Sequence, residues 1–158
     1  MTRESLTSTA LERAEKHCKE QGSKLTDKRR QVLSGLLASE KALSAYELSD
    51  FCRTELGHNI LPMSVYRILE FLEEQNLVHR LNLANKYVAC SHIACEHEHR
   101  LPQFLICTSC HRVEEVSLPS SVMSSIEGGA KTAGYHLARN QLELECICSD
   151  CPAQEELT

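Results

Sequence analysis

Apolar residues recur at helical spacing through the first half of the chain, and this pattern predicts four helices. The first helix covers about residues 6–21 and ends before Gly22, because glycine is common just beyond a helix C-terminus. Thr26 is a suitable N-cap for the second helix. The apolar face of that helix is made of four aliphatic residues: Val32, Leu33, Leu36 and Leu37.

The third and fourth helices have clearer start signals. Ser44 and Glu47 have the spacing of a capping box, so a helix should run from there to about Leu56. Pro62 is suited to the first turn of the fourth helix, and Gln75-Asn76 can end it. One face of this helix is apolar: Val65, Ile68, Leu69 and Leu72. The opposite face carries Ser64, Arg67 and Glu70.

Two short strands follow, 78–83 and 86–90, joined by a tight turn at Ala84-Asn85. Three helices and a two-stranded ribbon form the outline of a winged helix-turn-helix, whose last helix enters the DNA major groove. Candidate base contacts near the start of that helix are Ser64, Tyr66 and Arg67, and candidate phosphate contacts are Lys24, Lys28, Arg29 and Arg30. Many small helical domains with an exposed arginine bind no DNA, and Tyr66 could instead be a core residue.

The second half alternates strands with one helix. We expect a strand over 112–118, a helix over 120–133 opened by Pro119, and a long strand over 136–147. In that last strand apolar residues alternate with glutamates, as in a half-buried strand. The fold class is therefore mostly α followed by a small α/β domain. We expect a winged-helix domain over residues 1–83, a hinge over 84–102, and a small α/β domain over 103–158.

Composition separates the same two halves. The chain has 158 residues, nine cysteines, eight histidines and a formal charge of −5. Residues 1–83 are formally neutral, so residues 84–158 carry the whole negative charge and seven of the cysteines. This balance disfavours a non-specific polyanion binder but allows one locally basic face. The start of the chain has no secretory h-region and no apolar run reaches membrane-spanning length, so we expect a cytoplasmic protein without membrane contact.

Cysteines in such a compartment are more often metal ligands than disulfides. Cys107 and Cys110 form one CxxC motif, and Cys148 and Cys151 form another. Two such pairs complete a tetrahedral four-cysteine zinc site, and four protein ligands make it structural rather than catalytic. A pair of thioredoxin-like redox motifs is the alternative, but neither motif begins a helix after a parallel strand. Cys18 and Cys52 are expected to be small core residues.

A second group of metal-ligating residue types lies around the first motif: His79, Cys90, His92, Cys95, His97, His99, Glu114 and Glu115. This surplus of nitrogen, oxygen and sulfur donors suggests a second metal site where the two domains join. The alternative is a solvated surface loop, because histidine-rich loops often bind nothing.

The segments PMSVYRILEFLEEQNLVHR (62–80), YVAC (87–90), CTSC (107–110) and CSDC (148–151) together resemble the ferric uptake regulator family, and within it the zinc-sensing branch. The likeness runs from LTDKRRQVL (25–33) to Cys151. The family commonly has threonine in place of Ser64 and proline in place of Asp27. Both residues here keep the local chemistry, because serine retains a hydroxyl and aspartate suits a first helical turn.

The resemblance implies a homodimeric, metal-dependent repressor that binds operator DNA, with two zinc ions per chain. It also implies that the hinge over 84–102 is the metal-sensing loop and that the α/β domain over 103–158 is the dimerisation domain. The structural zinc ligands are Cys107, Cys110, Cys148 and Cys151. The sensing ligands are His79, Cys90, His99 and Glu115, with His97 an open alternative to His99. Tyr46 joins Tyr66 and Arg67 as a DNA contact. Asp50 and Arg53 either pair across two dimers on one operator or form an exposed intrahelical pair.

The thiolate of Cys90 favours zinc over iron or manganese, which suit nitrogen and oxygen ligands. The expected output is repression of zinc-uptake genes when zinc is plentiful, without enzymatic activity. Rival interpretations are an iron or manganese sensor of the same family, a thiol-redox regulator that uses Cys95 or Cys146, and a zinc enzyme or a zinc-ribbon adaptor. The enzyme would need an open coordination position and a catalytic motif, and no such motif is recognised.

Overall fold

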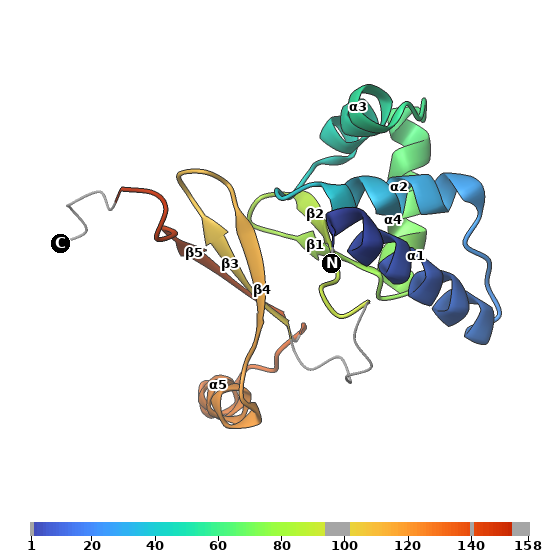
Figure 1. Ribbon diagram of the computed structural model, residues 1–158. Coiled ribbons are helices and arrows are strands. Elements are labelled where there is room, and N and C mark those ends of the chain that lie inside the picture. Colours follow the sequence, from blue (N-terminus) through green and yellow to red (C-terminus); the bar gives the residue numbers. More distant parts are fainter. Residues whose placement is uncertain (1, 94–101, 140, 153–158) are drawn as a thin grey trace. The chain divides into compact units, whose positions relative to one another are not determined.

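The computed structural model describes residues 2–93, 102–139 and 141–152, and the chain divides into two compact units, Met1–His97 and Glu98–Thr158 (Figure 1). The elements of the first unit are α1 (Arg3–Glu20), α2 (Asp27–Ala38), α3 (Ala45–Leu56), α4 (Pro62–Glu74), β1 (Val78–Leu81) and β2 (Lys86–Ala89). Those of the second are β3 (Pro102–Cys107), β4 (Val113–Ser117), α5 (Ser120–Thr132) and β5 (Leu142–Cys146).

The helices of the first unit begin and end at the predicted signals. The hydroxyl of Thr26 accepts a hydrogen bond from the backbone N–H of Arg29 at the start of α2. Ser44 and Glu47 form both hydrogen bonds of the capping box, at 3.2 and 2.8 Å. Pro62 occupies the first turn of α4, and Gly22 adopts a left-handed φ of 74° just beyond α1. The predicted helix boundaries are therefore confirmed to within a few residues.

The four helices and the ribbon of this unit enclose one hydrophobic core. The predicted apolar faces of α2 and α4 supply its centre: Val32, Leu33, Leu36, Val65, Leu69 and Leu72. Cys18 and Cys52 are fully buried, which confirms them as core residues. Gly35 of α2 marks the closest approach of α2 to α3, because a Cβ atom there would lie 2.7 Å from Cys52 Sγ.

The ribbon is an antiparallel pair in which Val78 faces Ala89 and Leu81 faces Lys86. Both strands are shorter than predicted, since residues 82–85 form the turn and Asn85 takes a left-handed φ of 49°. Leu43, just before α3, adds a bridge to Tyr87 through two backbone hydrogen bonds of 2.8 and 3.1 Å. Lys86 also pairs with Glu47 at 3.1 Å, so the ribbon is fastened to the start of α3.

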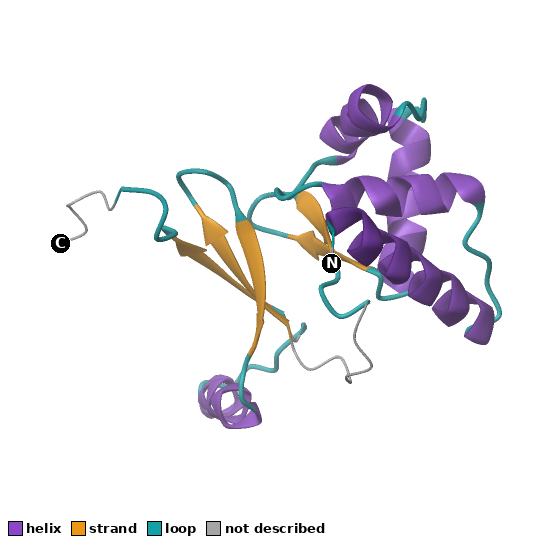
Figure 2. Cartoon of the chain, viewed as in Figure 1, coloured by secondary structure: helices purple, strands orange, loops and turns teal. Residues whose placement is uncertain are grey.

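The second unit has a three-stranded sheet in the order β4-β3-β5, with α5 in the connection between β4 and β5 (Figure 2). β3 pairs antiparallel with β4 and parallel with β5. The predicted strand over 136–147 is wrong in length, because strand pairing covers only Leu142–Cys146. Residues 136–139 lie outside any strand, and pairing with β3 is described from Leu142, which faces Gln103.

The expected burial of the last strand is also wrong for the single chain, since Leu144 is 46% exposed. The hinge predicted over 84–102 includes β2 and part of the segment outside the described residues, so its role stays a prediction. Among the described residues, no helix combines the length and apolar character that a membrane span requires.

Candidate functional site

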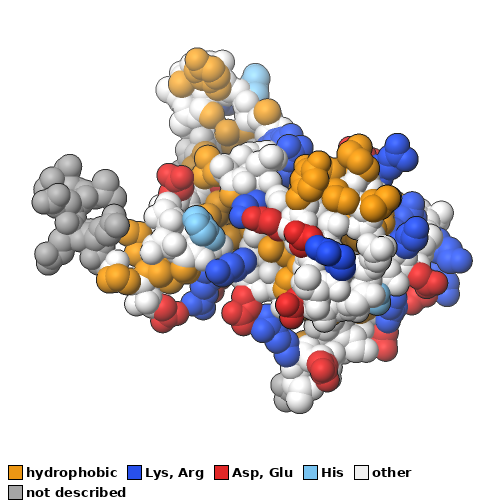
Figure 3. Space-filling view, turned by 90° about the horizontal axis from the view of Figure 1, so that it is seen from above, with side chains coloured by type: hydrophobic (Ala, Val, Ile, Leu, Met, Phe, Trp, Pro, Cys, Tyr) orange, Lys and Arg blue, Asp and Glu red, His pale blue; other side chains and the backbone are white. Residues whose placement is uncertain are grey.

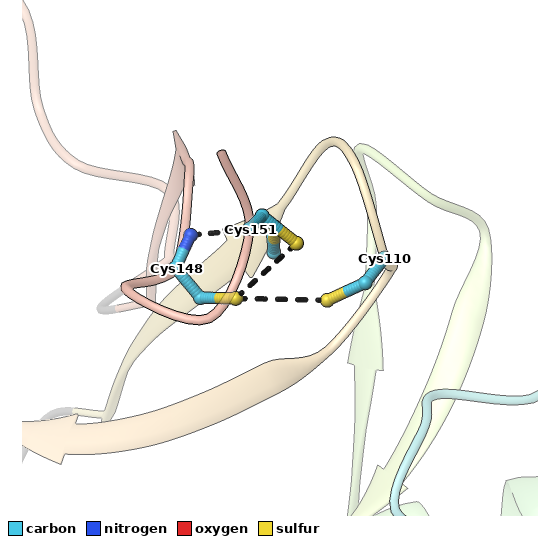
Figure 4. Close-up of side chains that lie close together, drawn as sticks. Cys110, Cys148 and Cys151 are labelled. Atoms are coloured by element: carbon cyan, nitrogen blue, oxygen red, sulfur yellow. Dashed lines mark hydrogen bonds between the residues drawn. The ribbon is translucent and has the colours of Figure 1, made fainter. Parts of the chain in front are cut away.

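The four cysteines of the two CxxC motifs meet at one end of the sheet in the second unit. Figure 4 shows three of them, Cys110, Cys148 and Cys151, with their side chains turned toward one another. Cys107 ends β3 and Cys110 lies in the turn before β4, while Cys148 and Cys151 lie in the loop after β5. The parallel pairing of β3 with β5 places Cys107 opposite Cys146, which brings the second motif beside the first. The four cysteines that the sequence spacing predicted as ligands of one zinc therefore lie together, and their role as ligands stays a prediction.

The sulfur atoms have the spacing that zinc requires. The Sγ–Sγ distances are 3.7 Å for Cys110–Cys148, 3.6 Å for Cys148–Cys151 and 3.9 Å for Cys107–Cys151. A tetrahedral zinc with Zn–S bonds of about 2.3 Å needs sulfur atoms about 3.8 Å apart. All four cysteines are free thiols, and their sulfur atoms lie within 4.8 Å of one another. The residues therefore fit a zinc site with four thiolate ligands.

Backbone N–H groups in this cluster stabilise the deprotonated form of Cys107. The N–H groups of Cys110 and Cys148 point at the sulfur of Cys107, the second at 3.4 Å, and lower the pKa of Cys107 to about 6. Such donors stabilise the thiolate, the form that binds zinc. Arg112 also pairs with Asp150 at 2.7 Å and joins the two cysteine loops. No sequence pattern signals that pair, because the two residues are 38 positions apart.

Two predicted sensing ligands lie side by side on the ribbon of the first unit. His79 of β1 faces Val88 in β2, and Cys90 follows two residues later on the same face. The ligand atoms of His79 and Cys90 lie within 4.8 Å of each other. Cys90 is buried, and its N–H donates to the carbonyl of Leu77 at 2.9 Å, which fixes its position.

Glu115, the third predicted sensing ligand, lies on β4 of the second unit opposite Phe104 and is half-buried, while the neighbouring Glu114 is exposed. Cys95, His97 and His99 lie outside the described residues. The choice between His97 and His99 and the completeness of the sensing set therefore stay predictions.

The predicted base-contacting residues gather where α3 and α4 begin. The rings of Tyr46 and Tyr66 meet edge to face, with centroids 6.2 Å apart and planes at 81°. Tyr46 is 61% exposed, Arg67 is exposed and Ser64 is half-buried. Tyr66 is 36% exposed, so it is a surface residue rather than a core residue.

The predicted phosphate-contacting side chains differ in whether their charged groups already contact other residues of the protein. Lys28 is exposed. The guanidinium of Arg29 lies 3.5 Å from the centre of the Phe71 ring and donates to the carbonyl of Lys24 at 2.6 Å. Arg30 pairs with Glu15 at 3.2 Å. Contact of these residues with DNA stays a prediction, and Arg29 has a structural role in addition.

Asp50 and Arg53 form an ion pair within α3 at 2.5 Å, and both side chains are more than half exposed. This is the intrahelical arrangement that their i,i+3 spacing allows. Any contact between neighbouring dimers stays a prediction.

Comparison with known proteins gives a consistent result. The sequence profile of the ferric uptake regulator family matches residues 20–153. The zinc uptake regulation protein of Escherichia coli (strain K12) is 34% identical over 145 residues, covering 92% of this chain and 82% of that protein. A structure of a zinc uptake regulator complexed with zinc and DNA has a TM-score of 0.79 and 32% identity, covering 92% of this chain and 94% of that one.

A second solved structure, holo XcZur, has a TM-score of 0.73 and 35% identity, and the match covers 89% of this chain and 95% of that one. The family profile spans both CxxC motifs and the whole of α4. The fold of a winged helix-turn-helix followed by an α/β domain is confirmed, and so is the resemblance seen in the motifs. The chain belongs to the ferric uptake regulator family.

Proposed function

We propose that this protein is a zinc-responsive transcriptional repressor that binds operator DNA as a homodimer and controls zinc-uptake genes. The observation that carries the proposal is the pair of His79 and Cys90 on the ribbon, a nitrogen and a thiolate donor within 4.8 Å. Thiolate ligands favour zinc over iron and manganese. The 32% identity to a zinc uptake regulator complexed with zinc and DNA supports the same metal and the same partner.

We assign two zinc ions to each chain. The cluster of Cys107, Cys110, Cys148 and Cys151 is the structural site, since four protein ligands leave no open position. The ligands that we assign to the sensing zinc are His79, Cys90, Glu115 and His99, of which His99 lies outside the described residues. Bound zinc supplies coordinate bonds that hold such ligands in one arrangement.

The ribbon is well placed to pass that constraint to the DNA-reading helices. β1 follows α4 after three residues, and β2 is bridged to Leu43 in front of α3. A constraint on His79 and Cys90 therefore acts on the helices that carry Tyr46 and Arg67. Because coupling between two sites is reciprocal, operator DNA should tighten sensor zinc by the factor with which zinc tightens DNA binding.

DNA reading is assigned to the start of α4. Arg67 can donate two hydrogen bonds to guanine O6 and N7, with Tyr46, Ser64 and Tyr66 beside it. Lys28 and Arg29 are assigned to phosphates. Two dimers on one operator would use the exposed Asp50 and Arg53 of α3. We place this regulator in the cytoplasm, with its DNA, and assign it no enzymatic reaction.

The test measures zinc per chain and operator affinity on the same samples, before and after a mild chelator. Operators are first selected from random duplexes with the zinc-loaded protein. We expect two zinc ions to fall to one with helical content kept, and operator binding to be lost and then restored by zinc alone. The Cys90→Ala variant should hold one zinc and bind DNA without a zinc response.

Cys146→Ala is the matched control, because Cys146 is a half-buried cysteine outside both assigned ligand sets. It should keep two zinc ions and the full response. Restoration by iron or manganese instead of zinc would move the assignment to another metal. A zinc response that survives in Cys90→Ala would refute the ligand set. A response to oxidant that is lost in Cys146→Ala would favour thiol-redox regulation.

A further inference from the structure

Large apolar side chains are exposed at the start of α3 and α4, where a folded chain would normally place polar residues. Leu61 is 69% exposed and Met63 is 64% exposed, and the rings of Tyr46 and Tyr66 are exposed as well. Figure 3 shows hydrophobic side chains gathered over the α3 region of the first unit, with Lys and Arg side chains around them. Leu61 and Met63 have no polar group, so they gave no sequence signal for binding.

The backbone holds both residues in defined positions. Leu61 is the N-cap of α4, and the hydroxyl of Ser49 donates to the carbonyl of Ile60 at 2.6 Å, which fixes the segment against α3. Met63 lies three and four positions before Tyr66 and Arg67, so the three side chains share one face of α4. This is the face to which base reading is assigned.

The chemistry of these side chains selects their target. Neither leucine nor methionine can donate a hydrogen bond to a phosphate or to a base edge. The major groove offers such a residue one favourable apolar partner, the C5-methyl group of thymine. We propose that Met63 and Leu61 contact thymine methyl groups and thereby set a preference for thymine at the base pairs beside the one that Arg67 reads. This inference rests on the proposed function.

The test replaces single thymines of the selected operator by uracil, which removes the methyl group and leaves every hydrogen bond intact. For the zinc-loaded wild type we expect an affinity loss of about 4-fold at each contacted thymine, the value of one buried carbon group. Met63→Ala should abolish the loss at one set of thymines and Leu61→Ala at another. The slope of affinity against salt should not change, because no phosphate contact is lost.

Leu6→Ala is the matched control, since Leu6 is a 48% exposed leucine on α1 and lies outside this face. It should keep the wild-type sensitivity to uracil at every position. Helical content and zinc per chain should be unchanged in all three variants, because the replaced side chains are exposed and none is an assigned zinc ligand. If the wild type binds the operator but loses no affinity when thymine is replaced by uracil, the thymine-methyl inference is overturned and the proposed function stands. The same holds if the affinity losses persist in both Met63→Ala and Leu61→Ala. Failure of the zinc-loaded wild type to select any operator would overturn the proposed function and this inference together.

Discussion

A methyl group added at Gly35 should destabilise the helical unit, because α2 and α3 cross there without room for a side chain. The Cβ atom of an alanine would lie 2.7 Å from Cys52 Sγ and 2.9 Å from Leu48 Cδ1. Both neighbours are fully buried, so neither side chain can move into solvent. The Gly35→Ala variant therefore has to push two helices apart or force a side chain out of its preferred rotamer.

Two opposing terms set the size of the effect. Overpacking a core costs about 1–3 kcal/mol, and two simultaneous clashes place this site near the upper end. Alanine gains about 1 kcal/mol over glycine inside a helix. We expect the free energy of unfolding to fall by about 1–2 kcal/mol. In a Cys52→Ala background the closer clash is absent, so the same change should cost at least about 0.5 kcal/mol less.

The assay is urea denaturation followed by the far-UV circular dichroism of the helices, with zinc concentration held constant because bound metal shifts the apparent stability. Gly128→Ala is the control, since a Cβ atom at Gly128 in α5 meets nothing within 4 Å. That variant should be unchanged or stabilised by up to about 1 kcal/mol. A Gly35→Ala midpoint equal to or above the wild type, or a cost that is the same with and without Cys52, would refute the packing argument.

Two further predictions concern single polar side chains of the first unit. The Ser44 backbone N–H donates to the Glu47 carboxylate and, with help from Lys86, lowers the pKa of Glu47. The ionised carboxylate therefore stabilises the fold at pH values above the ordinary glutamate pKa. This stabilisation is lost as the pH falls through the lowered pKa of the folded state. Glu47→Gln should thus lower the free energy of unfolding at pH 7 by less than about 1 kcal/mol, because the group is exposed, and by a smaller amount at pH 4. Equal losses at the two pH values, measured by urea denaturation, would contradict this. Arg29→Ala should cost about 0.5–1 kcal/mol through loss of the Phe71 contact. If Arg29 also contacts a phosphate, Arg29→Ala should reduce the slope of log affinity for the operator against log salt concentration by about 1, as we expect for Lys28→Ala. An unchanged slope in Arg29→Ala would limit Arg29 to its structural role.

Local signals explain why so much of the first unit was predictable. Thr26, the Ser44 and Glu47 capping box, and Pro62 act within one helical turn of themselves, so their effect can be read without knowing the fold. The two CxxC motifs were equally readable, because each one brings two sulfur atoms together through a short turn.

Features that depend on a distant partner were not predictable. The pairing of β5 with β3 joins Leu142 to Gln103, which are 39 positions apart. The bridge from Leu43 to Tyr87 joins residues 44 positions apart, and nothing in either segment signals it. The position of Arg29 over Phe71 likewise follows from how α2 packs against α4. The same limit applies to the sensing site, whose predicted ligands come from four separate parts of the sequence.

The four-cysteine cluster also has a consequence in terms of chain entropy. In the described part of the second unit, few hydrophobic side chains are buried: Phe104, Ile106, Cys107 and Met123. Zinc held by the cluster would close a loop, since Cys110 and Cys148 are 38 positions apart and α5 lies between them. A permanent link across a loop of that length lowers the conformational entropy of the unfolded chain and so raises its free energy by about 4 kcal/mol. Zinc bound by the four thiolates would thus add a restriction of the unfolded chain to the burial that this small core provides.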